Sequence, residues 1–359
     1  MLSLIFVVLA SLLLLLTFIT LSRSEVWWVR GMDFPRLQVG IFALVILLLE
    51  VLLLDFDQPI TWLTTAATFA CICYQAWWII PYTPFYPVEV QQSTRADPDN
   101  SIAILAANVL TKNRNAPALL ELVHAHKPDI LVTLESDKWW QQQLDKSLTD
   151  YSYTIKKPLD NLYGMHVYSK LALEDIAIQF LVEDEVPSIH VAVVLRSGRK
   201  VRVHFLHPAP PSPTENDEST ERDAELLVVA KKVEKSDDPI IVAGDLNDVA
   251  WSATTRLFRK ISGLLDPRVG RGMFNSFHAD YKFVRWPLDH LFHSSHFLLV
   301  DIQRLPAFGS DHFPMLIKLV FRPENQAVQK GIEPAGDDKQ WANEKIAAQS
   351  TQSVHSPKI

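Results

Sequence analysis

The sequence contains very little cysteine and little glycine. Cys71 and Cys73 are the only cysteines in the 359 residues, and both lie inside one long apolar run. A disulfide framework or a cysteine-based metal site is therefore not available to the rest of the chain. Only 11 glycines occur, and no glycine-rich phosphate-binding loop is present. Any phosphate chemistry must rest on other residue types.

Positive charge is in deficit. The chain has 34 Lys and Arg against 41 Asp and Glu, which gives a net charge of -7. Because phosphate contacts on nucleic acids are made largely by Lys and Arg, this balance argues against a general nucleic-acid coat protein. It does not exclude a metal-dependent enzyme, since a bound cation can meet a phosphate instead.

Long apolar runs are abundant, and most of them fall in the first eighty residues. Runs at 2–21, 39–54 and 60–80 predict helices that span the hydrocarbon core of about 30 Å. The first run lacks a basic start and a small-residue cleavage site, which disfavours a cleaved signal peptide. Tryptophans typical of interfacial belts lie near the ends of the runs: Trp27, Trp28, Trp62, Trp77 and Trp78. We predict a transmembrane region over residues 1–81 and an integral protein of a bacterial inner (plasma) membrane.

The remainder divides into three parts. Residues 82–100 are rich in proline and predict an extended linker. Residues 101–321 alternate strand and helix patterns with several hairpins, which indicates an α/β domain with mixed or antiparallel sheets. Residues 322–359 are polar and predict a disordered tail.

Predicted strands in the globular domain repeatedly end in polar residues. Taken singly, each has an ordinary explanation as the first residue of a turn. Together they indicate one site, because the ends of strands that share a sheet meet along one edge. These residues are Asn108, Glu135, His207, Asp245, Asn247, Asp289, Asp311 and His312.

The motifs around these residues resemble the endonuclease/exonuclease/phosphatase superfamily. The strongest pair is "GDLN" at 244 followed by "GSDHFP" at 309. Weaker pieces occur in the same order as in the family: "NVL" at 108, "LES" around Glu135, "YGMHVYSK" at 163, "LHP" at His207 and "LDHLF" at 288. The resemblance covers roughly residues 101–321 and implies a four-layer α/β/β/α sandwich, the fold of DNase I.

The resemblance also implies roles for individual residues. Glu135 would be the main carboxylate ligand of Mg²⁺ or Mn²⁺, with Asn108 and Asp311 beside it. Asp245 would orient or deprotonate the attacking water, and Asp289 would orient His312 as a base or as a cationic phosphate clamp. Asn108, His207 and Asn247 would contact the substrate. Leu110 stands where some relatives carry a further carboxylate, which favours one metal or a weaker second one.

The expected function is a membrane-anchored, metal-dependent phosphoesterase acting on a phosphomonoester, pyrophosphate or phosphodiester. The membrane anchor favours a lipid-linked substrate. A membrane-tethered nuclease is the alternative, although no dense basic and aromatic stretch marks a strand-binding groove. A catalytically inactive binding module is the alternative from another class. Nothing in the sequence identifies a protein partner.

Two observations disagree about the side of the membrane on which the predicted catalytic domain lies. Arg23, Arg30 and Arg36 lie in the first loop between spans, and the positive-inside rule puts that loop and the catalytic domain in the cytoplasm. The resemblance extends to three-span membrane phosphatases that act on polyprenyl pyrophosphates outside the cytoplasm, which puts the domain outside. Both orientations stay open at this point.

Overall fold

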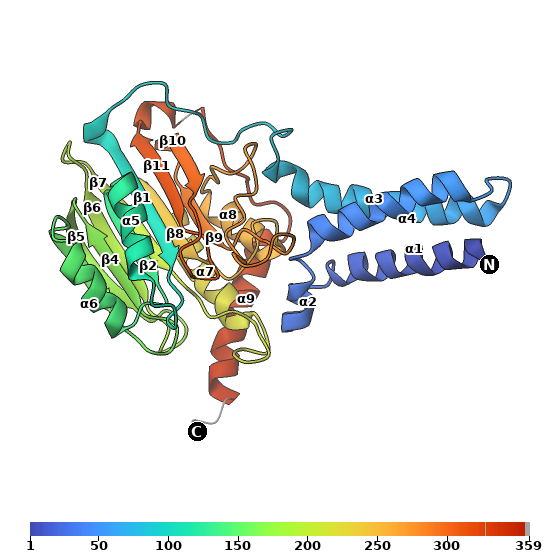
Figure 1. Cartoon of the computed structure of the whole chain (residues 1–359), viewed down its shortest axis with the longest axis horizontal. Coiled ribbons are helices and arrows are strands. Elements are labelled where there is room, and N and C mark those ends of the chain that lie inside the picture. Colours follow the sequence, from blue (N-terminus) through green and yellow to red (C-terminus); the bar gives the residue numbers. More distant parts are fainter. Residues whose placement is uncertain (327, 356–359) are drawn as a thin grey trace.

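The computed structural model describes residues 1–326 and 328–355, and it shows a rod of helices attached to one side of a two-sheet domain (Figure 1). The rod consists of α1 (Leu2–Ile19), α3 (Arg36–Leu53) and α4 (Pro59–Ile79). Each of these helices is long and apolar enough to cross a membrane. A narrow stripe that includes Leu13 and Ile46 packs between them, whereas most of their large apolar side chains face outward. The three predicted apolar spans correspond to these three helices.

The path of the rod brings the first loop to the two-sheet domain. The N-terminus lies at the free end, α1 runs toward the domain, α3 runs away and α4 returns (Figure 1). The connection between α1 and α3 contains a short helix, α2 (Trp27–Gly31), and is bonded to the domain through its backbone. Trp27 N donates to Asp217 O at 2.9 Å, and Ser219 N donates to Glu25 O at 2.7 Å.

The domain is built from two mixed sheets. The first has the strand order β10-β11-β1-β2-β4-β3, and the second has the order β5-β6-β7-β8-β9. The strands are β1 (Ser101–Asn108), β2 (Ile130–Leu134), β3 (Tyr153–Lys157), β4 (Met165–Ser169), β5 (Ala172–Gln179), β6 (Ser188–Val194), β7 (Lys200–Leu206), β8 (Ile240–Asp245), β9 (Asp289–His293), β10 (Phe297–Arg304) and β11 (Met315–Phe321).

Helices cover the outer face of each sheet, which gives four layers. Helices α5 (Ala116–His126) and α6 (Lys138–Ser147) pack on the first sheet, and α7 (Thr220–Glu234), α8 (Ala253–Ser262) and α9 (Asp338–His355) pack on the second. Alternation along β1 explains the layering, because successive side chains of a strand point to opposite faces. Ile104 and Ala106 face the core between the sheets, while Leu105 and Ala107 face the helices. The predicted four-layer α/β/β/α sandwich is confirmed.

The linker and the tail are more ordered than the sequence predicts. Within 82–100, Ser93 N donates to Leu299 O at 2.7 Å, so the linker runs along β10. In the tail, α9 lies against α7 with Ala342 and Lys345 buried. The expectation of a disordered tail therefore differs from the structure, because a few buried contacts suffice to fix a mostly polar helix. Residues 327 and 356–359 of this tail lie outside the described residues.

Candidate active site

The polar strand ends of both sheets meet at one place. In the first sheet, Asn108 ends β1 and Glu135 follows β2, while in the second sheet Asp245 ends β8. Asn108 Nδ2 donates to Glu135 Oε1 at 2.8 Å and to Asp245 Oδ2 at 3.1 Å, so this amide joins the two sheets. The sequence argument placed these residues along one sheet edge. The structure distributes them over two facing sheets, with His207 following β7, Asp289 opening β9, and Asp311 and His312 preceding β11.

Unusual backbone conformations hold these strand ends in place. Gly244, one residue before Asp245, has φ +144°, and a Cβ there would lie 1.9 Å from Leu206 O. Only glycine therefore allows β7 and β8 to approach so closely at this point. Glu135 and Asn247 have φ values of 54° and 51°. Left-handed non-glycine residues are uncommon, and they concentrate at functional sites where the surrounding structure maintains them.

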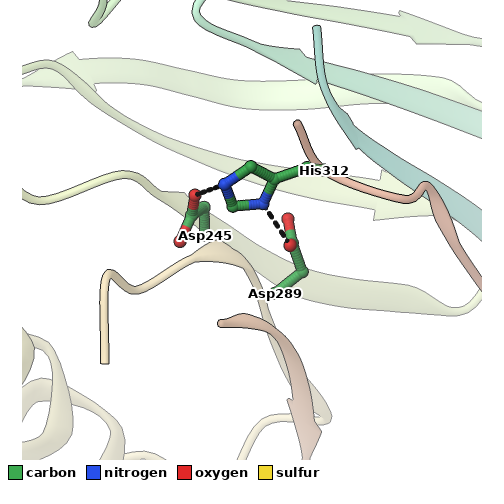
Figure 2. A group of neighbouring side chains, drawn as sticks. All are labelled: Asp245, Asp289 and His312. Atoms are coloured by element: carbon green, nitrogen blue, oxygen red, sulfur yellow. Dashed lines mark hydrogen bonds and ion pairs between the residues drawn. The ribbon is translucent and has the colours of Figure 1, made fainter. Parts of the chain in front are cut away.

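His312 is held between two carboxylates (Figure 2). Its Nδ1 lies 2.7 Å from Asp289 Oδ2, and its Nε2 lies 3.4 Å from Asp245 Oδ2. All three side chains are buried. Burial opposes protonation of the ring, but Asp289 and Asp245 outweigh it and raise the pKa of His312 to about 10. The ring is therefore a fixed cation at neutral pH, and His312 in turn helps to hold the pKa of Asp245 below its usual value against the effect of burial.

The best place for a metal ion is beside Glu135. The ligand atoms of Asp245, Asp289 and His312 lie within 4.8 Å of one another, but both ring nitrogens of His312 already face carboxylates and offer no lone pair. In contrast, Glu135 Oε2 is buried, and no group in the described part of the chain donates to it. Burial raises the pKa of Glu135 to about 7. A divalent cation would satisfy this oxygen and restore the carboxylate charge, with Asp311 as a neighbouring carboxylate. Asn108 turns its Nδ2 to Glu135 while its Oδ1 accepts from Leu110 N at 3.1 Å, so ligation by Asn108 would require the amide to turn over.

His207 and Asn247 occupy the second-sheet side of the site. Burial lowers the pKa of His207 to about 4, so its imidazole is neutral, and its Nδ1 has no partner among the described residues. Asn247 Nδ2 donates to Pro208 O at 3.0 Å. The buried Arg222 donates to Asn247 O at 2.8 Å and forms an ion pair with Asp248 at 3.5 Å, which fixes the turn after β8.

The polar strand ends form one wall of a cleft of about 650 Å³, and we call this side the catalytic wall because the sequence predicts the catalytic residues there. One side carries Glu135, Asn247, Asp311 and His312. The opposite side is formed by the connection between the first two membrane helices: Trp27, Arg30, Gly31, Phe34 and Pro35. Sequence reasoning missed this second wall, because it used the arginines of the connection only to decide membrane topology. The tryptophan pair that precedes Arg30 was the available signal.

Comparison with known families identifies the domain. The sequence model of the endonuclease/exonuclease/phosphatase family matches residues 105–312, which is more than half of the chain and contains all eight polar strand-end residues. The chain belongs to this family. This membership confirms the resemblance drawn from the motifs. The site of this family member supports hydrolysis of a phosphate ester. A comparison with curated proteins finds no match.

Solved structures of this family share the fold at low sequence identity. The D. rerio TDP2 structure with a single-strand DNA product is 17% identical, with a TM-score of 0.52 over 62% of this chain and 99% of that one. The human Nocturnin catalytic domain with bound sulfate is 17% identical, with a TM-score of 0.50 over 63% of this chain and 96% of that one. A family protein from Bacteroides thetaiotaomicron is 18% identical, with a TM-score of 0.50 over 63% and 97%. The helical rod lies outside residues 105–312, the part of the chain that the family model matches.

Proposed function

We propose that the protein is a membrane-anchored, divalent-metal-dependent phosphoesterase that hydrolyses a lipid-linked phosphomonoester, pyrophosphate or phosphodiester. The observation that carries this proposal is the composition of the cleft. Its catalytic wall belongs to the phosphoesterase domain, and its other wall belongs to the connection between two membrane helices. A substrate in this cleft lies beside the bilayer surface from which a lipid headgroup would enter.

Asn108, Glu135 and Asp311 are the proposed ligands of Mg²⁺ or Mn²⁺. When bound, the cation would neutralise charge on the phosphoryl oxygens and polarise the phosphorus–oxygen bond. The unsatisfied Glu135 Oε2 supports this assignment, because a buried carboxylate oxygen without a donor is costly unless a cation or a proton meets it. Asn108 is also proposed to contact the substrate, since its amide lies between the two sheets.

The chain's own groups would move and hold the protons. Asp245, ionised at neutral pH, is proposed to orient the attacking water and accept its proton. His312 would act as a positively charged clamp on a phosphoryl oxygen, with Asp289 fixing the ring. His207 and Asn247 would donate further hydrogen bonds to phosphoryl oxygens. His207 is suited to this role because it is neutral and Nδ1 is free of a described partner.

The second wall suits an amphiphilic substrate. Phe34 packs edge-to-face on Trp286 at 5.4 Å, and Trp27 lines the same side. Arg30 also lines the cleft, and its buried Nε has no partner among the described residues. A lipid-linked substrate could place its phosphate at the catalytic wall and its hydrocarbon chain along the aromatic residues of the opposite wall. No observation on this chain favours the nuclease alternative, and the presence of all eight strand-end residues opposes an inactive module.

The test is hydrolysis of four substrates by the full-length protein in detergent with Mg²⁺, with the products separated by chromatography so that cleavage of monoesters, pyrophosphates and diesters is detected alike. The substrates are a polyprenyl pyrophosphate, a phospholipid phosphate, an inositol phosphate and single-stranded DNA. We expect turnover of a lipid-linked phosphate and its loss in Asp245→Asn. Turnover of DNA alone would show that the protein is a membrane-tethered nuclease and would contradict the proposal. If all four substrates remain unhydrolysed and Glu135→Gln binds metal as the wild type does, the alternative of a catalytically inactive binding module would be supported instead.

We also propose that the protein resides in a bacterial inner membrane, with its N-terminus and its catalytic domain on opposite faces. Three spans require this arrangement. The positive-inside rule favours a cytoplasmic domain. The ion pairs of Arg30 and Arg36 with Asp33, at 3.6 Å and 2.5 Å, do not alter this, because the rule counts basic residues and not net charge. Impermeant labelling of a cysteine placed before Met1 and of another at Lys330 tests the arrangement in intact cells. Labelling of both or of neither would contradict it.

A further inference from the structure

A second cleft lies on the membrane side of the catalytic domain. It has a volume of about 560 Å³ and is formed where the first turns of α3 meet the 275–286 loop and the end of β10. One wall consists of the span residues Ile41, Phe42 and Val45. The other wall carries three cationic side chains, Lys282, Arg285 and Arg304. We call this feature the basic cleft.

The cations of the basic cleft are not neutralised by the protein. Arg285 Nη2 donates to Ala279 O at 3.0 Å, and Arg304 Nη1 donates to Asn275 O at 2.9 Å, so both guanidinium groups bond to backbone carbonyls. Both also pack on the ring of Phe313, at 4.9 Å and 4.5 Å. Within the described ranges, neither arginine nor Lys282 forms an ion pair with a carboxylate. Burial and the neighbouring charge of Arg285 lower the pKa of Arg304, which shows that the two charges repel each other.

The acidic residue nearest in sequence does not fill this role. Asp280 has a side chain that is 78% exposed and lies 3.9 Å from His278. Three further carboxylates close by in sequence are also engaged elsewhere. Asp289 pairs with His312, Asp301 accepts from Gln303 Nε2, and Asp311 lines the catalytic cleft. An external anion is therefore the group that would balance the three cations.

The loop that carries Lys282 contacts the end of α3 that lies next to the domain. Gln38 Nε2, in the first turn of α3, donates to Phe283 O at 3.1 Å. Tyr281, Phe283 and Val284 are 57%, 88% and 43% exposed, which is unusual for a row of large apolar side chains in water. Exposed aromatic residues interleaved with basic ones are the pattern of protein segments that enter the interfacial region of a bilayer.

We propose that the basic cleft binds one anionic phospholipid from the leaflet that faces the catalytic domain. The lipid phosphate would lie among Lys282, Arg285 and Arg304. An acyl chain would run along Ile41 and Val45 into the bilayer. This lipid is distinct from the substrate, because the basic cleft and the catalytic cleft have no lining residue in common.

One loop separates the two clefts and links them. Residues 275–286 present Lys282 and Arg285 to the basic cleft, while Phe277 and Trp286 line the catalytic cleft. Ala279 N donates to Asp311 O at 2.6 Å, and the Phe277 ring lies 4.9 Å from the His312 ring. A lipid in the basic cleft would therefore brace the loop that supports the catalytic wall.

Native mass spectrometry of the full chain in detergent tests the proposal. EDTA is included so that no hydrolysis occurs, and phosphatidylglycerol is compared with phosphatidylcholine. We expect the wild type to retain one phosphatidylglycerol and to bind phosphatidylcholine much more weakly. The triple variant K282Q/R285Q/R304Q should bind phosphatidylglycerol about 100-fold more weakly, as loss of three interfacial charges implies. The control K138Q/K146Q/K235Q removes the same charge from exposed lysines on α6 and at the end of α7, and should bind normally.

Hydrogen–deuterium exchange locates the bound lipid. Phosphatidylglycerol should slow exchange in residues 275–286 of the wild type and of the control, and not in the triple variant. The single variants R285Q and R304Q are measured in parallel. Each keeps one guanidinium group on the Phe313 ring, so they still test the proposal if the triple variant does not fold. Undiminished phosphatidylglycerol binding by all three variants would overturn the proposal. Protection confined to residues 27–35 would assign the lipid to the catalytic cleft and would also overturn it.

Discussion

His312 Nδ1 lies 2.7 Å from Asp289 Oδ2, although the two residues come from different sheets. Asp289 opens β9 in the second sheet, whereas His312 lies in the loop that leads into β11 of the first. This hydrogen bond fixes the ring so that Nε2 faces Asp245 and the mouth of the cleft. The position of the His312 imidazole therefore depends on how the two sheets pack.

Replacing Asp289 by asparagine should lower kcat by about 10²- to 10³-fold, the usual effect of losing one preorganised electrostatic contact in the transition state. The amide keeps the shape of the carboxylate but removes the charge that raises the pKa of His312. KM should change little, because Asp289 acts through His312. Steady-state kinetics measures both constants. Asp150→Asn, at a surface carboxylate that is 62% exposed, is the matched control, and equal kcat in the two variants would contradict the assigned role.

Glu135→Gln should abolish stabilisation by Mg²⁺. In the wild type, a cation that binds only the folded protein should stabilise it by about 2.7 kcal/mol at a concentration of 100 times its Kd. Thermal unfolding with and without Mg²⁺ measures this difference. Glu121→Gln on the exposed face of α5 should respond as the wild type does. A full Mg²⁺ response in Glu135→Gln would move the metal site elsewhere, for example to the Asp245, Asp289 and His312 group.

Much of the fold and of the catalytic wall could be predicted from the sequence, because both depend on local patterns. Strand periodicity and polar strand ends predicted Glu135 and Asp245 at one site, and the structure places both within hydrogen-bonding distance of Asn108. Two features were not predictable in this way. The bridge that Asn108 forms between the sheets depends on how the sheets face each other. The wall that includes Arg30 depends on how the rod docks on the domain, about which the spacing of residues in the chain carries no information.

Phe34→Ala should distinguish a lipid-linked substrate from a soluble one. Phe34 lines the cleft and packs on Trp286 at 5.4 Å, so its loss removes apolar surface next to the proposed hydrocarbon site. We expect KM for a polyprenyl phosphate to rise about tenfold, as loss of about 1.4 kcal/mol of apolar contact implies. KM for a short soluble phosphate ester should stay unchanged. Phe56→Ala is the control, because Phe56 makes a similar edge contact with Trp62 at 5.1 Å at the far end of the rod. Equal changes for both substrates would contradict the aromatic wall.

The buried pair of Asp266 and Arg268 should make stability depend on pH in the acid range. Asp266 Oδ2 lies 2.8 Å from Arg268 Nη2, and Arg268 offsets burial to lower the pKa of Asp266 to about 2. A lowered pKa in the folded state stabilises the protein above the unfolded value of about 4, and this stabilisation is lost as the pH falls toward 2. Asp266→Asn should therefore cost about 2 kcal/mol or more at pH 7 and clearly less at pH 3. Unfolding of both proteins at the two pH values checks the sign, and a cost that grows toward pH 3 would refute it.

Lys345 should be the residue through which α9 contributes most to stability. Its side chain is 3% exposed, and Nζ lies 2.6 Å from Glu25 and 2.7 Å from Asp223. It therefore joins the C-terminal helix, the connection after α1 and the start of α7. Lys345→Met removes the cation but leaves two carboxylates close together in a buried setting. Breaking such a pair costs about 3–5 kcal/mol of the free energy of unfolding.

The matched control for this prediction lies on the same helix. Lys339 is 64% exposed and pairs with Glu234 at 2.7 Å, so Lys339→Met should cost less than about 1 kcal/mol. Limited proteolysis should then cut near α9 in Lys345→Met and not in Lys339→Met, because only the first variant loses a buried attachment. Similar unfolding free energies and cleavage patterns for the two variants would show that α9 is held by its apolar contacts with α7 rather than by Lys345. Faster cleavage of Lys345→Met would instead establish that this charge network fastens the tail to the segment that also forms the second wall of the cleft.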